Sequence, residues 1–495
     1  MIPLLNSRKE SIIYVCCMAF MISLICVVCV SAAESDRIQP YVENPYYWQY
    51  KGEPVLLLGG SKEDNLFNHP DGLEEHLDLL VACGGNYVRN TMGSYDEGNP
   101  YGFHLNQETG LYDLNKMGEE LWERFSNFLK MTAERDIIVQ IEVFDRFDYA
   151  QENWQKNPFN PKNNINYTVE ESGLPEVINS HPAHRENPFF RSVPNLENNT
   201  LLLPWQEAFV SEMLSYSLQY GHVLYCISNE TNESEEWGAY WANYIRSAAS
   251  DAGVEVHITE MWDNWDLTHP EHNSTFDHPE LYTFIDISQN NHISGQAHWD
   301  NTQYIRNRIK ENPRPINNIK MYGGVTHGGS LEEGLRRMWR NALGGMASAR
   351  FHRPGPRGDV DPLWGAGLGI KAQAYIRSTR YLMNEMGWPN IEPTLSFVSI
   401  STDQANQVRS ENGIPALQPH LHEDASIAAI KSPDGARAAI FVSHGACLEV
   451  DTSQLKEGLQ TQWFDPRNIA WLEAVPTEKG YFQPPSTEDW LLVLR

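Results

Sequence analysis

The fold is decided by the stretch Val223-Leu224-Tyr225-Cys226-Ile227-Ser228-Asn229-Glu230, an apolar run that ends in polar residues. A short, nearly unbroken apolar run is typical of a parallel strand that is covered on both faces. Apolar side chains then recur at helical spacing, which predicts an amphipathic helix; they are Trp237, Tyr240, Trp241, Tyr244, Ile245 and Ala248. Together the two segments form a strand–helix unit.

The same unit recurs on both sides of this stretch. We expect eight strands, at Val55–Gly60, Asn86–Arg89, Ile137–Phe144, Val223–Ser228, Glu255–Thr259, Thr283–Ile287, Pro315–Met321 and Ala347–Phe351. Between them lie helical stripes such as Met117–Leu129 and Leu331–Ala342. Regular alternation of this kind predicts an α/β fold, a (β/α)8 TIM barrel. A doubly wound sheet is the alternative, but its Gly-rich phosphate turn is poorly matched by Gly59-Gly60-Ser61-Lys62.

Two segments outside the strand–helix units should shape the ends of the barrel. Tyr46–Tyr50 and Lys51–Pro54 resemble a small hairpin that would close its floor. Asp145–Thr200 is a long polar segment that leaves from the carboxyl end of the third strand. Loops of that length are usually functional.

The pattern changes after about Gly387. From Thr394 onward short alternating strands separated by turn residues predict an all-β sandwich; they are Ser426–Ile430, Ala436–Val442, Leu448–Val450, Gln460–Phe464, Ala470–Ala474 and Trp490–Leu494. We therefore divide the chain into an N-terminal leader (1–33), a barrel (34–393) and a small sandwich (394–495).

The first 33 residues have the order of a secretory signal peptide. Arg8 and Lys9 precede the apolar run Ile12–Val30, and the small residues Ser31-Ala32-Ala33 follow it. Cleavage there predicts a secreted or periplasmic protein with no membrane span in the mature chain. An uncleaved membrane anchor is the alternative, because the run is nearly long enough to span. Cys83, Cys226 and Cys447 then remain, too few and too widely spaced for a disulfide framework.

Composition narrows the class of ligand. A formal net charge of −28 argues against a nucleic-acid partner, which needs a basic face. Fifteen Trp and twenty-two Tyr are compatible with a carbohydrate partner, because flat rings stack on the C–H faces of sugars. A large barrel also buries many aromatic residues in its core, so this content alone is ambiguous.

In a barrel of this type the reacting groups lie at the carboxyl ends of the strands. Those ends supply Arg89 and Asn90; Glu142 and Asp145; Asn229 and Glu230; Glu260, Trp262 and Asp263; Asp286, Gln289, Asn291 and His292; Lys320 and Tyr322; and Arg350, His352 and Arg353. Amides, carboxylates and cations dominate this set. It contains no metal-ligand spacing, nucleotide loop or GxSxG nucleophile motif, so we predict neither a metal nor a cofactor.

Glu230 is the leading catalytic candidate. Cleavage of a glycosidic bond requires two carboxyl groups, of which one protonates the leaving oxygen and the other attacks or activates water. Placed directly after the fourth strand, Glu230 would be the acid and Asn229 would hold a sugar hydroxyl. Alternatively, Glu230 only caps the following helix.

These features resemble a known family. Asn229-Glu230 on the fourth strand and Arg89-Asn90 on the second resemble the clan A glycoside hydrolases. The closer likeness is to apiosidase-like barrels with a C-terminal sandwich often labelled a collagen-binding domain. The segment Trp463-Phe464-Asp465-Pro466-Arg467 and the last strand, Asp489-Trp490-Leu491-Leu492-Val493-Leu494, are similar to that sandwich. The resemblance covers nearly the whole mature chain and implies a hydrolase of complex polysaccharides, acting at chain ends or within the chain.

The chain departs from this family at the seventh strand. The resemblance implies a nucleophilic Glu there, but Lys320 stands at about that position, and an ammonium group cannot form a glycosyl ester. We therefore expect the partner carboxylate elsewhere: Glu260 first, then Asp286, then Asp263 and Glu142. Glu260 could instead be structural and neutralise Arg89 or Lys320. Whether the enzyme retains or inverts the anomeric configuration stays open.

Basic side chains gather at the ends of the last two strands. Lys320, Arg350, His352 and Arg353 suggest an anionic sugar, uronic or sulfated, because Arg binds such groups bidentately. Ordinary ion pairing with Glu260 or Asp286 is the alternative. Trp262, Trp265 and Trp299 are the candidates for stacking on sugar rings, and His292 is expected to hydrogen-bond a sugar.

The sequence leaves two functions open. The first is a secreted glycosidase that cleaves a carbohydrate by carboxylate catalysis, with Glu230 as acid. The second is a catalytically silent barrel that binds glycans as a surface or scaffold protein, which Lys320 favours. A carboxylate about 5–10 Å from Glu230 would support the enzyme.

Overall fold

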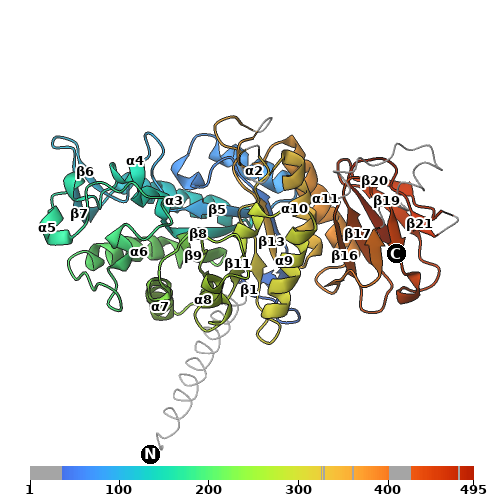
Figure 1. Ribbon diagram of the computed structural model, residues 1–495. Coiled ribbons are helices and arrows are strands. Elements are labelled where there is room, and N and C mark those ends of the chain that lie inside the picture. The colour runs from blue at the N-terminus through green and yellow to red at the C-terminus, as the bar shows by residue number, and fades with distance from the viewer. Residues whose placement is uncertain (1–35, 325, 327–328, 359–361, 401–424, 478–479) are drawn as a thin grey trace, which may run out of the picture.

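The computed structural model describes residues 36–324, 326, 329–358, 362–400, 425–477 and 480–495. The predicted leader, residues 1–33, lies outside this range. Figure 1 shows two bodies side by side, a large α/β body and a smaller body of antiparallel strands that contains the C-terminus.

Eight parallel strands form the larger body. They are β4 (Leu57–Gly60), β5 (Tyr87–Thr91), β8 (Ile138–Asp145), β9 (Val223–Asn229), β10 (Ile258–Thr259), β11 (Ile285–Asp286), β12 (Ile316–Asn317) and β13 (Ser348–Phe351). Six pair in the order β10-β9-β8-β5-β4-β13, and β11 pairs with β12. Backbone bonds from Ala347 N to Ile316 O (2.8 Å) and from Arg350 N to Asn318 O (3.0 Å) connect β12 to β13. This is the predicted (β/α)8 barrel.

Strands β10, β11 and β12 are shorter than predicted, at two residues each. Side-chain hydroxyls replace some of the bonds between neighbouring strands. Thr283 Oγ1 accepts from Ile258 N (3.1 Å), Ser288 Oγ from Ile319 N (3.1 Å) and Ser348 Oγ from Asn318 N (2.9 Å). The strand positions were thus predicted correctly, but not the loss of regular pairing.

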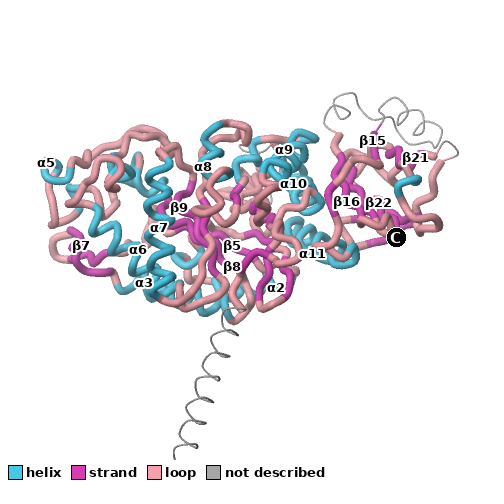
Figure 2. The backbone as a smooth tube through the Cα atoms, turned by 90° about the horizontal axis from the view of Figure 1, so that it is seen from below, coloured by secondary structure: helices cyan, strands magenta, loops and turns pink. Residues whose placement is uncertain are grey.

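Helices cover the outside of the barrel (Figures 1 and 2). The long ones are α2 (Leu73–Ala82), α3 (Glu119–Ala133), α6 (Leu203–Ser217), α7 (Glu235–Asp251), α9 (Gly295–Arg308), α10 (Leu331–Leu343) and α11 (Ile370–Met386). The predicted stripe on α7 faces the core, since Trp237 and Trp241 are fully buried. Met117 was wrongly assigned to a helical stripe; it ends strand β7 (Leu111–Met117), which pairs with β6 (Phe103–Asn106).

A three-stranded sheet of β1 (Gln39–Pro40), β2 (Trp48–Tyr50) and β3 (Glu53–Val55) precedes the barrel. The predicted hairpin is β2–β3, and its turn residues Lys51 and Gly52 both have positive φ. The buried Trp48 ring contacts His257 and Phe284, which lie at the amino ends of β10 and β11, and Trp48 Nε1 donates to Asn317 Oδ1 (2.9 Å). The hairpin therefore closes the floor of the barrel.

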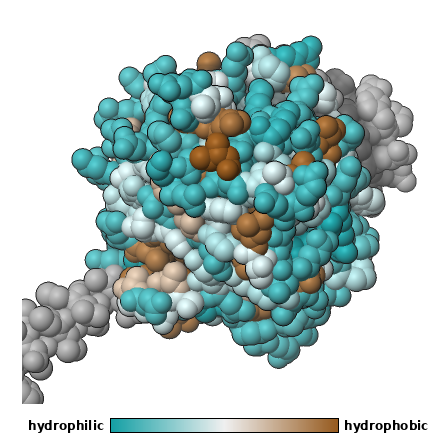
Figure 3. Space-filling view, turned by 90° about the vertical axis from the view of Figure 1, so that its left-hand side faces the viewer, coloured by the Kyte–Doolittle hydropathy of each residue, from teal (hydrophilic) through white to brown (hydrophobic). Residues whose placement is uncertain are grey.

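The long segment between β8 and α6 contains short helices: η2 (Arg146–Tyr149), α4 (Gln151–Trp154), η3 (Pro161–Asn163), α5 (Val169–Ser172) and η4 (Pro188–Arg191). Its aromatic residues form a local core in which Tyr149, Phe159 and Phe189 contact one another. Outside, this end of the molecule is mostly hydrophilic, with apolar residues in small separate groups (Figure 3). Between α7 and α9, α8 (Asn273–Phe276) follows η5 (Pro270–His272), and η6 (Ser288–His292) follows β11.

The C-terminal body is the predicted β-sandwich. One sheet has the order β14-β16-β17-β22-β19-β20, and the other has the order β15-β18-β21. Their bounds are β14 (Glu392–Pro393), β15 (Val398–Ile400), β16 (Ile427–Lys431), β17 (Ala438–Val442), β18 (Leu448–Val450), β19 (Thr461–Asp465), β20 (Ala470–Glu473), β21 (Tyr481–Phe482) and β22 (Trp490–Leu494), with η7 (Thr452–Gln454) after β18. The strands predicted from Ser426 onward agree within two residues at each end.

The sandwich lies against α10 and α11 (Figure 1). Phe464 of β19 contacts Trp339 of α10 and stacks on Tyr381 of α11. Arg336 of α10 pairs with Asp489 of the sandwich at 2.9 Å. In the described part of the chain, no helix is long and apolar enough to cross a membrane.

Candidate active site at the carboxyl ends of the barrel strands

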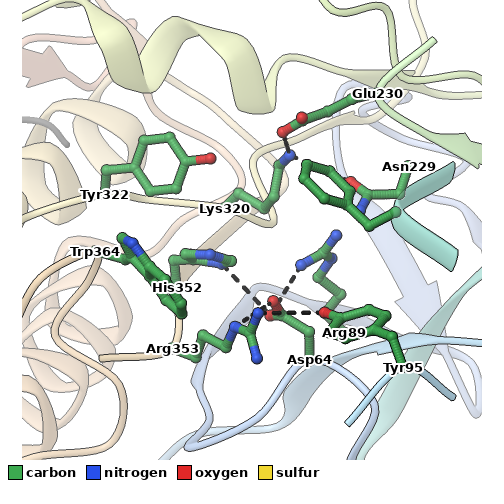
Figure 4. Close-up of a pocket in the computed structure, with 11 residues that line it drawn as sticks. Asp64, Arg89, Tyr95, Asn229, Glu230, Lys320, Tyr322, His352, Arg353 and Trp364 are labelled. Carbon is green, nitrogen blue, oxygen red and sulfur yellow. Dashed lines mark hydrogen bonds and ion pairs between the residues drawn. The ribbon is translucent and has the colours of Figure 1, made fainter. Parts of the chain in front are cut away.

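A pocket of about 260 Å³ opens at the carboxyl ends of the barrel strands, just below the usual size of small-molecule sites. Its lining combines carboxylates, cations, amides and aromatic rings (Figure 4): Asp64, Arg89, Tyr95, Phe147, Asn229, Glu230, Lys320, Tyr322, His352, Arg353 and Trp364. Most of these residues lie at or just beyond the ends of β4, β5, β9, β12 and β13. Residues far apart in the chain thus meet at the end where barrel enzymes place their sites.

Glu230 stands in a strained backbone conformation at the end of β9. Its φ is +60°, in the left-handed region that non-glycine residues seldom adopt. Strain of this kind persists where the surrounding structure holds it, often at functional sites. Directly before it, Asn229 donates through Nδ2 to Asp145 (3.0 Å) and accepts from the Lys320 ammonium (3.3 Å). The hydrogen bonds of Asn229 therefore fix the orientation of its amide.

Lys320 forms a buried ion pair with Glu230 inside the pocket (Figure 4). Burial by itself would raise the pKa of Glu230, but the adjacent ammonium outweighs it and the pKa of Glu230 is lowered. Conversely, burial opposes the charge of Lys320, yet Glu230 raises the pKa of that lysine. Both groups are therefore charged at neutral pH, and Glu230 is an anion rather than a proton donor.

Asp64 occupies the opposite side of the pocket in Figure 4, surrounded by cations. Its carboxylate forms ion pairs with Arg89 (2.8 Å) and Arg353 (3.0 Å), and the ring of His352 lies 3.4 Å from it. Despite burial, these charges hold the pKa of Asp64 well below its usual range. Burial lowers the pKa of His352 well below its ordinary value, so this imidazole is neutral.

Arg89 joins the pocket to a deeper carboxylate. Its guanidinium donates to both oxygens of Glu142, at 2.8 and 2.6 Å, and its third nitrogen reaches Asp64. Burial raises the pKa of Glu142 to about 7 in spite of this bidentate contact. Because Arg89 is held from both sides, it provides a fixed positive charge at the pocket floor.

Glu260, the first candidate for the partner carboxylate, does not line this pocket. Its carboxylate accepts from the backbone N–H groups of Ser228 (2.8 Å) and Met261 (3.0 Å). A Cβ placed on Gly238 of α7 would lie 3.1 Å from Glu260 Oε2, so the group faces the helix layer. The reading that Glu260 neutralises Arg89 or Lys320 was wrong, because Asp64, Glu142 and Glu230 do so.

Asp286, the second candidate, is also outside the lining. It accepts from Gln140 Nε2 (3.1 Å) and from Ser288 N (2.8 Å). Gln140 in turn accepts from Asn317 and Tyr87, so this carboxylate belongs to a polar network inside the barrel. Burial raises the pKa of Asp286 above its ordinary value.

The other predicted site residues divide into two groups. Six of them line the pocket together with Glu230: Arg89, Asn229, Lys320, Tyr322, His352 and Arg353. Asn90, Trp262, Asp263, Gln289, Asn291, His292 and Arg350 are not part of the lining.

Several of this second group support the framework instead. Asn90 accepts from Phe67 N (3.3 Å), Trp262 donates to Thr275 (2.8 Å), Asn291 donates to Asn318 (2.9 Å), and Arg350 donates to Ile319 O (2.9 Å). Gln289 is buried, and the ring of His292 contacts Tyr322. The prediction that Trp299 stacks on a sugar ring was wrong, because this residue is buried on α9. Trp265, another stacking candidate, is 60% exposed.

Sequence reasoning missed Asp64, Tyr95, Phe147 and Trp364. Asp64 follows the first barrel strand by four residues, so the rule that site residues lie at the carboxyl ends of strands could have identified it. That strand end was considered only as a possible phosphate turn. Trp364 lies far beyond the last barrel strand and reaches the pocket by contact with Arg353, whose guanidinium is 4.7 Å from the ring centre. No local pattern in the sequence marks such a loop residue.

The described residues offer no group of three or more His, Cys, Asp or Glu that could hold a metal ion. The lining of the pocket itself supplies two ion-paired carboxylates, three cationic side chains, one amide and aromatic faces.

Comparison with known proteins agrees with both parts of the fold. Residues 417–495 match the family model described as "Putative collagen-binding domain of a collagenase", the sandwich type expected from the resemblance. Among curated proteins, none matches the sequence.

Two solved structures resemble most of the chain. One described as "Glycoside hydrolase" has 11% sequence identity and a TM-score of 0.56, and the match covers 94% of this chain and 97% of the other. A protein from Bacteroides vulgatus, described as "a putative glycoside hydrolase", has 10% identity and a TM-score of 0.50, with 93% and 82% covered. At this identity the likeness establishes a shared fold, the barrel of glycoside hydrolases.

Proposed function

We propose that the protein is an exported glycoside hydrolase that cleaves bonds in a complex polysaccharide. The observation that carries the proposal is Asn229-Glu230, which stands at the carboxyl end of β9 and lines a pocket in a glycoside-hydrolase fold. Fold alone does not fix a reaction, so the proposal depends on the chemistry of this pocket.

The pocket suits a sugar in shape and polarity. Tyr95, Phe147, Tyr322 and Trp364 supply aromatic faces, and charged or amide groups lie between them. Glu230 remains ionised beside Lys320, so it suits the carboxylate that faces the anomeric carbon. The transition state of glycoside hydrolysis resembles an oxocarbenium ion, which an adjacent anion stabilises. This assigns to Glu230 the anionic role rather than the acid role first predicted.

An anionic sugar is the substrate class that we favour. Arg89, Lys320 and Arg353 bring three positive charges to the lining, against the two negative charges of Asp64 and Glu230. This excess stands out in a chain of net charge −28. Each of these cations already forms an ion pair with a carboxylate of the protein. The anionic group of a uronic or sulfated sugar would therefore bind a cation that also keeps its contact with that carboxylate.

Export is part of the proposal and is supported by the leader sequence, residues 1–33, with its charged, apolar and small-residue segments. The mature protein would be secreted or periplasmic and would meet polysaccharides outside the cytoplasm. N-terminal sequencing of the protein recovered from the extracellular or periplasmic fraction tests this point, with a mature terminus near Glu34 expected.

A hydrolysis screen tests the proposed activity. Purified protein is incubated with neutral polysaccharides, with a polyuronic acid, and with the same polymer after its carboxyl groups are reduced to alcohols. We expect release of reducing sugar, faster from the polyuronic acid than from its reduced form. Glu230→Gln should lower kcat by at least about 10²-fold, because it removes the charge that stabilises the transition state.

Glu260→Gln is the matched control, because it makes the same change on the neighbouring strand but outside the pocket. Burial raises the pKa of Glu260 to about 8, so this group is mostly uncharged at pH 7 and Gln resembles it. The control should keep most of the activity. Equal activity of wild type and Glu230→Gln would contradict the proposal.

One observation favours a second function, a barrel that binds glycans without cleaving them. The Lys320 ammonium occupies the carboxylate of Glu230, the residue on which catalysis would depend. If the wild type binds one of the polymers in affinity electrophoresis but releases no sugar from any of them, this second function replaces the first.

A further inference from the structure

Cleavage requires a carboxyl group that carries a proton, and Glu230 does not. Asp263, which lies four residues beyond the end of β10, differs in its surroundings from the other carboxyl groups near Glu230. Asp263 is connected to the Glu230 segment through the backbone: Thr231 and Trp262 form a parallel bridge, and Asp263 N donates to Thr231 O (3.0 Å). The two carboxyl groups therefore stand at the ends of adjacent barrel strands.

The bridge also indicates which way the side chain of Asp263 projects. Paired residues of neighbouring strands point to the same face, and the residues next to them point to the opposite face. Thr231 and Trp262 are the paired residues; both are buried, and Trp262 donates to Thr275 (2.8 Å). Asp263, next to Trp262, consequently projects away from the Trp262 side, while Glu230, whose left-handed backbone interrupts the alternation of β9, lines the pocket.

Asp263 differs from the other carboxyl groups near Glu230 in having no fixed partner. Asp64, Glu142, Asp145, Glu260 and Asp286 all accept hydrogen bonds or form ion pairs. Across the residues that the structure describes, no hydrogen bond or ion pair holds the side chain of Asp263, which is partly exposed. Its carboxyl group is therefore not committed to the framework and can exchange protons with solvent.

The charges around Asp263 keep a proton on it to higher pH than usual. Burial and the nearby Glu230 carboxylate raise the pKa of Asp263, while Lys320, His181 and His184 oppose this effect. The charge of Asp263 also acts on Arg146, whose pKa it raises against the larger effect of burial. The same pair of carboxyl groups thus has one pKa pushed down, that of Glu230, and one pushed up, which is the pattern of an anion and an acid.

We propose that Asp263 is the catalytic proton donor that works with the Glu230 carboxylate. This assignment rests on the proposed glycosidase activity. The proton of Asp263 passes to the glycosidic oxygen as the bond from that oxygen to the anomeric carbon breaks, and the bonding pair stays on the oxygen. Water then supplies the hydroxyl group that ends on the anomeric carbon and the proton that restores Asp263. Glu230 faces the positive charge that develops in between.

The role of an acid can be tested by changing how much the leaving group needs protonation. Wild type and Asp263→Asn are compared on an oligosaccharide of the sugar identified in the screen and on its 2,4-dinitrophenyl glycoside, whose leaving group departs without a proton. We expect kcat of the variant to fall by about 10²–10⁴-fold on the oligosaccharide. On the dinitrophenyl glycoside the loss should stay below about 10-fold, within the lower bound of a general-acid effect. The alkaline limb of the wild-type pH–rate profile should also disappear in the variant.

Asp266→Asn is the control, since Asp266 lies on the same loop but is bonded to Thr268. It should match the wild type on both substrates, and thermal unfolding should show that all three proteins are folded. An equal loss on both substrates would mean that Asp263 only maintains the site, which overturns the assignment. If the wild type cleaves neither substrate, the proposed function fails, and that outcome is distinct from a failure of Asp263 alone.

Discussion

At the scale of single residues, the pair of Lys320 and Glu230 has the largest consequence. Both side chains are buried, so removal of either one would leave the other as an uncompensated charge in the interior, which is strongly destabilising. Glu230 has a lowered pKa, so its contribution to stability is present above its ordinary pKa of 4.5 and is lost as the pH falls. Lys320 has a raised pKa, so its contribution is present below 10.5 and is lost at higher pH. The pair therefore stabilises the fold fully between these two values.

Lys320→Met should destabilise the protein by about 3–5 kcal/mol at pH 7, because it leaves a buried carboxylate without its main counter-ion. The pKa of Glu230 would then rise, since burial is no longer opposed. The deficit should therefore shrink as the pH falls toward 4.5, because the buried carboxylate of the variant takes up a proton over that range. Urea unfolding of both proteins from pH 4 to 8 measures this difference. The double variant Lys320→Met/Glu230→Gln should recover part of the loss, and a deficit that is independent of pH would contradict the argument.

At the scale of elements, the sequence predicted those strands correctly whose backbone groups hydrogen-bond to the backbone of a neighbouring strand. Strands β8 and β9 contain clear apolar runs, and together with β5 they were placed within two residues. The polar stretch around Asn317 and Asn318 gave the right position but the wrong length, because side chains of neighbouring strands take over the backbone bonds. Glu230 and its lysine were found because they stand at strand ends. Asp64 and Trp364 were not, since loops of irregular length bring them to the pocket.

The hairpin β2–β3 compensates for the short strands β10 to β12. Trp48 packs on residues at the amino ends of β10 and β11 and donates to Asn317 of β12, so one side chain joins three weakly paired strands. Trp48→Ala should lower the free energy of unfolding by about 3–5 kcal/mol. Trp48→Phe, which loses the hydrogen bond but keeps an aromatic ring, should cost less, and denaturant titration separates the two. KM should change little in either variant, because the pocket lies at the other end of the barrel; a large change in KM with unaltered stability would refute this role.

At the scale of the whole molecule, the sandwich appears in the sequence as a separate domain, yet the structure joins it to the barrel. Phe464, in the segment that resembles collagen-binding domains, turns toward Trp339 and Tyr381 of the barrel helices. Next to it on β19, Trp463 is buried in the core of the sandwich. Polar contacts surround this centre, including Arg336 with Asp489 (2.9 Å), Arg340 with Ser426 (3.0 Å) and Arg495 with Glu385 (2.7 Å). A residue that packs against the protein's own barrel is not available to an external partner.

This arrangement predicts that the two domains unfold together. In calorimetry the full chain should show one transition, and Phe464→Ala should lower that transition as a whole, with a loss of about 3–5 kcal/mol from the buried ring. Val475→Ala, at an exposed position just beyond β20, should stay within about 0.5 kcal/mol of the wild type. If Phe464→Ala lowered only a small transition and left the barrel's transition and its activity unchanged, the sandwich would be an independent module. A single shared transition would instead mean that the sandwich stabilises α10 and α11, and through them the strand ends that carry Lys320 and His352.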